Sequence, residues 1–181
     1  EGKGVLDLLE AFHIALDRSA VPLRLVFVGD GPLRPELERR IDAYGLRESV
    51  EFAGSVPNRE VPTLLRGADL LAVPSRTTRM WAEQVGMVFL QAMGCGVPVI
   101  STRSGSIPEF VPDREVGLLV DEGDVNALAR AMTELASNES LRAQFALRAR
   151  QVAEERYDIA KNIRTVEDLI ISLGKVANAC E

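Results

Sequence analysis

The segment from Glu83 to Glu109, EQVGMVFLQAMGCGVPVISTRSGSIPE, combines a carboxylate, a glycine at a predicted helix start and a loop rich in hydroxyl groups. Glu83 precedes Gly86, with which the predicted helix 86–93 begins. The free N–H groups and the dipole of a helix N-terminus favour an anion such as phosphate, and a glycine there lets a ligand approach the backbone. The loop Thr102–Ser106 offers further donors. Because the same glycines also suit plain turns, the spacing alone leaves both a phosphate site and a purely structural role open.

The composition limits the classes of protein to consider. With 181 residues, 46% of them hydrophobic, the chain is long enough for one domain with a substantial core. A net charge of −6 argues against a nucleic-acid-binding protein, which needs a basic face. The single histidine excludes a multi-histidine metal site, and Cys95 and Cys180 lack metal-ligand spacing, so no metal is expected.

The same sequence predicts where the protein is found. Two cysteines far apart are typical of free thiols in a reducing compartment. No apolar run reaches the length of about 18 residues that a membrane-spanning helix needs. We therefore expect a cytoplasmic protein without a transmembrane segment, with attachment of the full-length protein to a membrane surface as the alternative.

Apolar strand-like runs alternate with helical segments along the chain, a pattern typical of a parallel sheet with helices on both faces. This predicts an α/β, Rossmann-like fold in a single domain, with a helical segment from about residue 124. Strands are predicted at 23–28, 50–53, 69–73, 97–101 and 117–120, and helices at 4–18, 33–44, 62–66, 86–93, 124–136, 139–154 and 157–173.

Ligands of such sheets bind beyond the carboxyl ends of the strands. The sequence places Gly29-Asp30-Gly31, Gly54, Pro74-Ser75 and the loop 102–109 at those ends. The first of these could begin the dinucleotide fingerprint G-x-G-x-x-G, but Arg34 stands where the third glycine belongs. A phosphate-binding oxidoreductase domain is therefore disfavoured, although it remains an alternative.

Several segments resemble glycosyltransferase family 4. Residues 83–109 are similar to the family's E-x-F-G-x-x-x-x-E-A-M-A-x-G-x-P-V-[IV]-[AS]-[ST] followed by G-G-x-x-E. Further pieces match its K-G-[VIL], V-G-D-G-P, F-x-G, A-D-[LVI]-x-[LV]-x-P-S and G-L-L-V-x-x-G-D patterns in the same order. They are Lys3-Gly4-Val5, Val28 to Pro32, Phe52-Ala53-Gly54, Ala68 to Ser75 and Gly117 to Asp124. Each piece is weak alone, but their shared order makes the resemblance specific.

The resemblance implies a fold and a function. Members of the family have the GT-B fold, in which two Rossmann-like domains face each other across a cleft, and this chain resembles the C-terminal, donor-binding domain. The implied enzyme is a retaining glycosyltransferase that moves a sugar from a nucleoside-diphosphate sugar to an unknown acceptor and needs no cofactor. The rival interpretations are a sugar-nucleotide binding module without catalytic activity and a GT-B nucleotide-sugar epimerase.

The resemblance also assigns roles to individual residues. Lys3 should contact the donor diphosphate as a positive charge and Glu83 the hydroxyl groups of the sugar, so these two are the implied catalytic residues. The amides from Val85 to Met87 should bind the phosphates, and the backbone near Ser55-Val56 should lie beside the base. The implied donor-binding residues are Gly31, Val56, Ser75, Val85, Gly86, Met87 and Gln91.

This sequence departs from the family's pattern at Gln91, where the family has a second glutamate that binds the ribose. An amide offers one acceptor oxygen and one donor group in place of two acceptor oxygens. Nucleotide binding should therefore be weaker or altered, by about 1–2 kcal/mol. Ser106 also replaces the second glycine of the G-G loop, and Val85 an aromatic residue.

The family's strand order predicts a break in the sheet. In the resembling fold the strand before Lys3-Gly4 lies centrally, between the strands predicted here at 23–28 and 69–73. Because this chain begins at Glu1, we expect that strand to be missing and the two flanking strands not to be paired with each other. We further expect that the N-terminal, acceptor-binding domain belongs to the same natural protein and that this chain alone transfers nothing.

Several other side chains permit both a structural and a functional interpretation. His13, beside Phe12 in the first helix, favours a structural role. Trp81 could stack on a base or sugar, or cover the core. The arginines to consider are Arg34, Arg39 and Arg40 on a helix face that should be solvated, and Arg76 and Arg79, which flank the cleft and could pair with phosphate.

Overall fold

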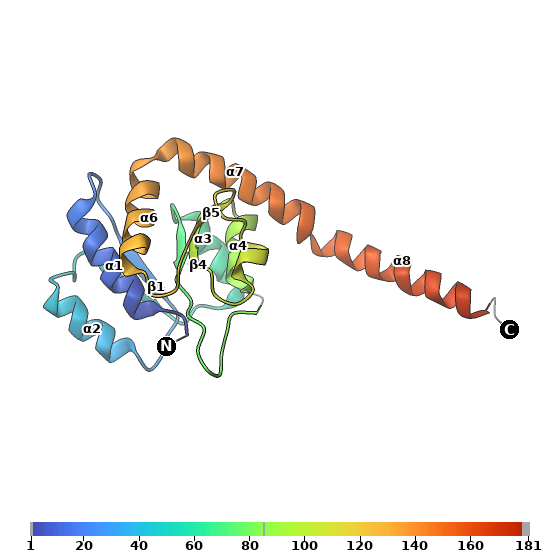
Figure 1. Ribbon diagram of the computed structural model, residues 1–181, viewed down its shortest axis with the longest axis horizontal. Coiled ribbons are helices and arrows are strands. Elements are labelled where there is room, and N and C mark those ends of the chain that lie inside the picture. Colours follow the sequence, from blue (N-terminus) through green and yellow to red (C-terminus); the bar gives the residue numbers. More distant parts are fainter. Residues whose placement is uncertain (1, 85, 179–181) are drawn as a thin grey trace.

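The fold is an α/β arrangement of parallel strands between two layers of helices, as the sequence predicts (Figure 1). The structure is a computed structural model that describes residues 2–84 and 86–178, with side chains described up to residue 173. The strands are β1 (Leu25–Val28), β2 (Val50–Gly54), β3 (Leu71–Val73), β4 (Val99–Thr102) and β5 (Gly117–Val120). All three pairings between these strands are parallel, which places the carboxyl ends of paired strands at one edge.

The strands form two separate sheets, one of order β1-β2 and one of order β3-β4-β5. Within the described residues β1 does not pair with β3, as the family's strand order predicts. Residues 2 and 3 form a turn and α1 begins at Val5, so neither fills the gap between the sheets. Val26 and Val28 of β1 are 42% and 49% exposed, which is unusual for valines in a strand and marks an uncovered part of the β1-β2 sheet.

One layer of helices comprises α1 (Val5–Arg18), α2 (Arg34–Ala43) and α6 (Val125–Ser137), which pack on each other and on the sheets. The other comprises α3 (Val61–Arg66), α4 (Met87–Gly94) and α7 (Glu139–Arg156). Two further helices are short, η1 (Asn58–Glu60), which contacts α3, and α5 (Ile107–Phe110). Helix α7 leads into α8 (Ile159–Asn178), which projects away from the rest of the molecule (Figure 1).

Apolar periodicity and capping explain these elements. Leu8, Leu9 and Phe12 lie on the stripe of α1 that faces the core, and all three are buried. Asp124 and Asn138 cap α6 and α7, because each side chain accepts a hydrogen bond from the backbone three residues ahead. The residues of β4 are all buried, as expected for a strand that has a neighbour on each side and helices on both faces.

The apolar side chains of α8 remain uncovered in this chain. They recur along the helix, and each is more than half exposed: Ile159, Ile163, Val166, Leu169, Ile170, Ile171 and Leu173. A helix of this kind gains most of its stability from packing its apolar face. In the described part of the chain, no helix combines the length and hydrophobicity needed to cross a bilayer.

The predicted boundaries differ from the observed ones in a regular way. The strands predicted to begin at residues 23, 69 and 97 each begin two residues later, because hydrophobicity starts before the ladder of main-chain hydrogen bonds does. The last helix begins at Ile159 and runs to Asn178, past its predicted end at residue 173. The short helices η1 and α5 were not predicted, since three or four residues are too few to display a period.

Candidate functional site

Lys3 and Glu83, 80 residues apart in the sequence, meet in space. The ammonium group of Lys3 donates a hydrogen bond to Oε2 of Glu83, and the two side chains form an ion pair. The Lys3 side chain is 55% exposed, whereas that of Glu83 is only 11% exposed. A carboxylate shielded from water therefore lies under a cation that is accessible to an anionic ligand.

The turn that carries Lys3 packs closely against the end of β3. Gly4 caps α1 in the left-handed conformation, at a φ of 64°. A Cβ added at Gly4 would lie closer than 3.0 Å to the backbone of Pro74. This close approach requires glycine, and it brings Lys3 to the carboxyl edge of the sheet.

The ring of Trp81 packs against Gly2 and Lys3. The Lys3 ammonium lies 4.9 Å from the centre of the Trp81 ring, within the range of a cation–π interaction. A Cβ added at Gly2 would lie 2.8 Å from Cζ3 of the same ring. The sequence left open stacking on a ligand and covering the core; the structure instead shows the ring packed against the turn of Gly2 and Lys3.

The N-terminus of α4 lies next to Glu83 in the sequence and in space. Gly86 is the N-cap residue, with a φ of 51°, and the buried ring of Phe89 lies directly beneath it. The amide of Ser106 donates to the carbonyl of Glu83 over 3.0 Å, which fixes the start of the loop that leads into α4. Gly105 permits this contact, because an added Cβ would meet the Glu83 backbone. The first N–H groups of α4 have no partner within the helix and form a site suited to an anion.

Gln91 lies on α4 and contacts the loop that follows β2. Its Nε2 donates a hydrogen bond of 2.8 Å to Oδ1 of Asn58. Gln91 is half-buried and Asn58 is exposed, so the amide lies at the surface of α4 rather than among apolar side chains of the core. The contact brings the loop containing Val56 toward α4.

The remaining predicted residues occupy strand ends or helix starts. Gly31 and Val56 follow β1 and β2, whose ends are joined by a 2.7 Å hydrogen bond from Gly29 N to Gly54 O. Met87 is the first residue of α4 and is 61% exposed. Ser75 follows β3 and is fully buried, and its hydroxyl has no hydrogen-bond partner among the described residues. Val85 lies outside the described residues.

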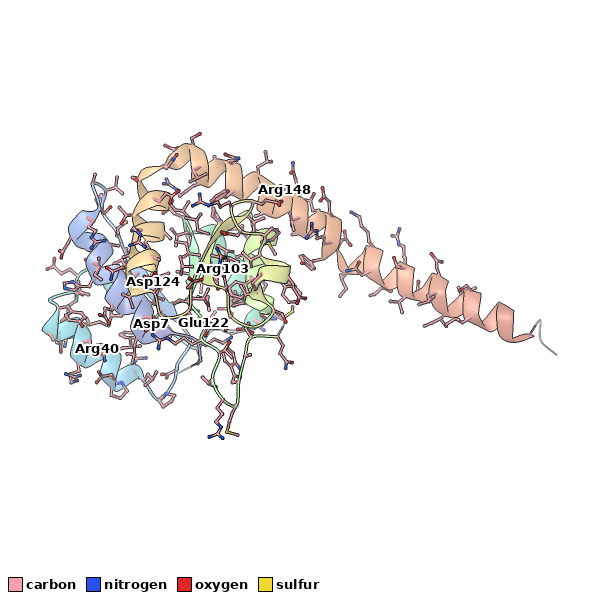
Figure 2. The ribbon with its side chains drawn as sticks, in the orientation of Figure 1. Asp7, Arg40, Arg103, Glu122, Asp124 and Arg148 are labelled. Atoms are coloured by element: carbon pink, nitrogen blue, oxygen red, sulfur yellow. The ribbon has the colours of Figure 1, made fainter. Side chains whose placement is uncertain are left out.

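A second cluster holds the loop between β3 and α4. Thr77 donates two hydrogen bonds of 2.7 Å to Glu122, one from its main-chain N–H and one from its hydroxyl. Its hydroxyl also lies 2.9 Å from the hydroxyl of Ser104, which is fully buried. Arg76 forms an ion pair with Asp7 of α1, so the free chain occupies with its own carboxylate an arginine that could have bound phosphate. Asp7 and Glu122 lie at the lower end of the sheets in Figure 2.

Sequence reasoning singled out Arg76 and the loop that contains Ser104 but missed Thr77, Glu122 and Asn58. Glu122 lies in a variable position of the matched G-L-L-V-x-x-G-D pattern, Thr77 lies in a loop, and Asn58 begins the three-residue helix η1, so none of them shows a period. Thr77 and Glu122 are 45 residues apart in the sequence, and Asn58 and Gln91 are 33 residues apart. A single sequence carries no signal that pairs side chains so far apart.

The Glu122 contacts predict a pH dependence of stability. Burial opposes ionisation, but the hydrogen bonds from Thr77 and Ser104 and the charge of Arg76 together outweigh it and hold the pKa of the Glu122 carboxyl below its ordinary value of 4.5. A carboxyl whose pKa falls on folding stabilises the protein above its unfolded pKa, and that contribution disappears as the pH drops through the folded value. The free energy of unfolding of Glu122→Gln should therefore lie below that of the unsubstituted chain at pH 7, with the difference shrinking below pH 4.5. Urea titrations of both proteins at several pH values test this, and a constant difference would contradict it.

The remaining polar side chains considered from the sequence have structural partners. His13 stacks on Tyr44, with ring centres 4.5 Å apart. Arg39 and Arg40 both bind Glu36 and lower the pKa of its carboxyl to about 2. Arg34 pairs with Glu38 and lies over the ring of Phe52, so α2 presents a face of paired charges. Arg79 differs from these residues, because it is exposed in the loop before α4.

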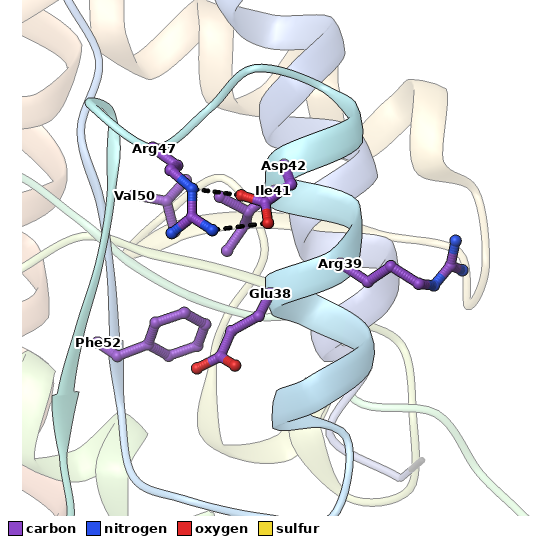
Figure 3. Close-up of a pocket in the computed structure, with 7 residues that line it drawn as sticks. All are labelled: Glu38, Arg39, Ile41, Asp42, Arg47, Val50 and Phe52. Atoms are coloured by element: carbon purple, nitrogen blue, oxygen red, sulfur yellow. Dashed lines mark hydrogen bonds and ion pairs between the residues drawn. The ribbon is translucent and has the colours of Figure 1, made fainter.

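A surface hollow of about 380 Å³ lies between α2 and β2 (Figure 3). Its lining residues are Glu38, Arg39, Ile41, Asp42, Arg47, Val50 and Phe52. Asp42 and Arg47 form an ion pair across its rim. None of the predicted site residues contributes to it, so this hollow is separate from the cluster around Lys3 and Glu83.

The geometry joins a lysine, a carboxylate and a helix N-terminus, and comparison with known proteins identifies the family. The sequence model of the family described as "Glycosyl transferases group 1" matches residues 1–152. The chain belongs to the group 1 glycosyltransferases.

Curated relatives in this family carry several activities. A GDP-mannose-dependent alpha-(1-6)-phosphatidylinositol monomannoside mannosyltransferase from Mycolicibacterium smegmatis is 37% identical over 131 residues, which are 71% of this chain and 34% of that protein. An N-acetyl-alpha-D-glucosaminyl L-malate synthase from Bacillus anthracis is 32% identical over 167 residues, or 92% of this chain and 42% of that protein. The chain thus spans less than half the length of these relatives.

Solved structures of glycosyltransferases resemble the fold. The Anabaena protein Alr3699/HepE in complex with UDP superimposes with a TM-score of 0.83 at 26% identity, over 94% of this chain and 46% of that chain. The C-terminal domain of a group 1 glycosyl transferase (LpcC) from Francisella tularensis has a TM-score of 0.76 at 26% identity, over 87% of this chain and 81% of that chain. This group 1 glycosyltransferase chain therefore has the Rossmann-like fold of one domain of such enzymes.

Proposed function

We propose that this chain is the C-terminal, donor-binding domain of a retaining, family 4-type glycosyltransferase that transfers a sugar from a nucleoside-diphosphate sugar. The observation that carries the proposal is the meeting of Lys3 and Glu83 beside the N-terminus of α4. The similarity to a separately solved C-terminal domain and to a UDP complex supports it. The acceptor is not specified by any residue described here.

Each group at the site has a role in this reaction. The N–H groups at the start of α4, those of Gly86 and Met87, hold the phosphates of the donor. Lys3 stabilises the negative charge that develops on the departing nucleoside diphosphate. A cation already held in place does this without a rearrangement of the site during the reaction. Glu83 accepts hydrogen bonds from hydroxyl groups of the sugar, and its shielding from water strengthens them. Because Lys3 binds Glu83 in the free chain, donor binding changes the partner of the ammonium group.

The nucleoside part of the donor lies, in this proposal, along the ends of β1, β2 and β3. Gly31, Val56 and Ser75 follow these strands, and Gln91 contacts the loop of Val56 through Asn58. Ligands of parallel sheets bind at such strand ends.

We propose that a further domain of the same protein supplies the acceptor site. The chain spans 34% and 42% of the two curated relatives, which leaves most of their length unaccounted for. The edges of β1 and β3 that pair with no described strand, and the exposed apolar side chains of α8, offer surfaces for such additional chain. Enclosing the cleft positions the acceptor and excludes water, which transfer requires.

A thermal-shift panel of UDP-, GDP- and ADP-sugars on this chain tests donor binding. A ligand that binds only the folded state raises the unfolding temperature, and the increase grows with the logarithm of the ligand concentration once that concentration exceeds Kd. We expect one nucleotide to stabilise the chain and no glycoside to form without the rest of the protein. If none of the three raises the midpoint at millimolar concentration, the proposed donor site is wrong.

Transfer by the full-length protein separates an enzyme from a sugar-nucleotide binding module, the second candidate. Gln91 in place of the family's ribose-binding glutamate is the feature that favours the second candidate. Binding without release of nucleoside diphosphate from any donor would support the binding module.

The role of Gln91 leads to a prediction of its own. Replacing Gln91 with Glu should strengthen binding of the nucleotide about tenfold, because a carboxylate accepts hydrogen bonds from both hydroxyls of a ribose and bonds to charged groups exceed neutral ones by about 1 kcal/mol or more. Asn58 can turn its amide to donate to the new carboxylate, so the contact between α4 and the loop should persist. Isothermal titration with the nucleotide found in the panel measures the change.

A matched substitution controls for charge in the Gln91→Glu experiment. Gln84→Glu adds the same charge at an exposed position before α4. If both variants change the affinity equally, or Gln91→Glu changes it not at all, Gln91 does not face the ribose.

A further inference from the structure

The loop from Arg76 to Glu83 is held at its first residues rather than at its tip. Met80 in the middle of this loop is 95% exposed. The loop between β3 and α4 projects at the bottom of Figure 1. Near the start of the loop, the Thr77 N–H and hydroxyl both donate to the carboxylate of Glu122. Glu122 lies in the turn between β5 and α6, so this contact ties the loop to the far edge of the three-stranded sheet.

The tied residue is adjacent to the base of a hairpin that carries Trp81. Thr78 N–H donates to the carbonyl of Trp81 over 2.7 Å, and Thr78 and Trp81 form an antiparallel bridge. Trp81 in turn lies against Gly2 and beneath the ammonium group of Lys3. A continuous set of contacts therefore runs from Glu122 through Thr77 and the hairpin to Lys3.

Other contacts also hold the start of the loop, since Arg76 pairs with Asp7 and the hydroxyl of Thr77 lies 2.9 Å from that of Ser104. The Arg76 N–H donates to Gly2 O over 2.8 Å, which holds the loop against the turn of Lys3 one residue before Thr77. The two bonds of Glu122 restrain both the backbone and the side chain of Thr77. A bidentate contact of this kind fixes orientation as well as distance.

We propose that Glu122 is a positioning residue, whose carboxylate holds Thr77 so that Trp81 packs beneath Lys3 and places the ammonium group for the donor diphosphate. Glu122 acts through Thr77 and Trp81 and does not itself touch the donor. The inference rests on the proposed function only for the identity of the ligand that Lys3 meets. The placement of Trp81 can be measured without any ligand.

The chain offers a direct probe of this placement, because Trp81 is its single tryptophan. The experiment compares Glu122→Gln, Thr77→Val and the double variant with the unsubstituted chain. Tryptophan emission and its quenching by acrylamide report the exposure of the ring, and isothermal titration with UDP, GDP and ADP reports the affinity for a diphosphate. The thermal midpoint shows whether each variant remains folded.

We expect Glu122→Gln to shift the Trp81 emission to longer wavelength, to increase quenching and to weaken nucleotide binding about tenfold, the factor to which 1.4 kcal/mol corresponds. The effects of Glu122→Gln and Thr77→Val should not add, because the two residues share the same hydrogen bonds. The direction is informative, since loss of a negative charge near an anion site would by itself strengthen binding.

Asp121→Asn is the matched control. It removes the same charge from the neighbouring residue of the same turn, where the side chain is 84% exposed and reaches only Arg103 at 3.7 Å. We expect the control to leave the Trp81 emission unchanged. Unchanged emission, quenching and affinity in Glu122→Gln would overturn the proposal, and so would identical changes in the control. If the unsubstituted chain binds none of the nucleotides, the proposed function fails, while the emission of the variants still decides whether Glu122 positions Trp81.

Discussion

Replacing Lys3 with methionine in the full-length protein is expected to slow release of nucleoside diphosphate from the donor sugar by about 10²–10³-fold, as loss of one preorganised charge-stabilising group does. The ammonium is the cation that lies over Glu83 and beside the start of α4, where the developing charge would appear. Methionine keeps a flexible apolar side chain of similar length that can still lie on Trp81. Because the lost interaction is strongest in the transition state, kcat should fall more than KM rises.

Two further variants separate this effect from a loss of stability. Lys3→Met leaves the shielded carboxylate of Glu83 without its partner, which itself destabilises the loop. The double variant Lys3→Met, Glu83→Gln removes that unpaired charge and should recover thermal stability but not the rate. Lys161→Met, which removes an exposed ammonium from α8, should leave the rate unchanged. A Lys3→Met protein that keeps most of its rate would show that Lys3 does not act on the leaving group.

The sequence predicts most elements of this fold, for identifiable reasons. The long helices α1, α6 and α7 carry enough residues to show an apolar period, and the strands are apolar runs bounded by Gly, Pro or Ser. The separation of β1 from β3 followed from the strand order of the resembling family and from no residue in the chain. Periodicity reports burial within an element, so it cannot report how the elements join into sheets.

In the candidate site, too, some contacts could be predicted from the sequence and others could not. The resemblance placed Lys3 and Glu83 at one site, and the structure brings their side chains together. Neither motif nor spacing indicated that Trp81 would pack under Lys3, or that Glu122 would bind Thr77. These contacts depend on how two loops meet across the edge of the sheet, and such long-range pairing leaves no period in the sequence.

Gly86 is the position where the site and the stability of the domain depend on the same residue. Its φ of 51° lies in the left-handed region, which costs a residue with a Cβ about 1–2 kcal/mol. A Cβ there would also lie 2.7 Å from Cε2 of Phe89, a ring that is fully buried and therefore cannot turn away without disturbing the core. Gly94, at the other end of α4, has no atom within 4 Å of an added Cβ and no positive φ.

Gly86→Ala is therefore expected to lower the free energy of unfolding by about 3 kcal/mol, as strain and overpacking together imply, and to abolish detectable nucleotide binding. Gly94→Ala in the same helix should instead stabilise the chain by about 0.5 kcal/mol, since alanine restricts the unfolded chain and suits a helix. Urea unfolding of both variants measures the two changes. Adding Phe89→Leu to Gly86→Ala should restore part of the lost stability, because the smaller side chain relieves the contact but not the strain in φ. Equal stabilities of the two alanine variants would show that the start of α4 does not require glycine.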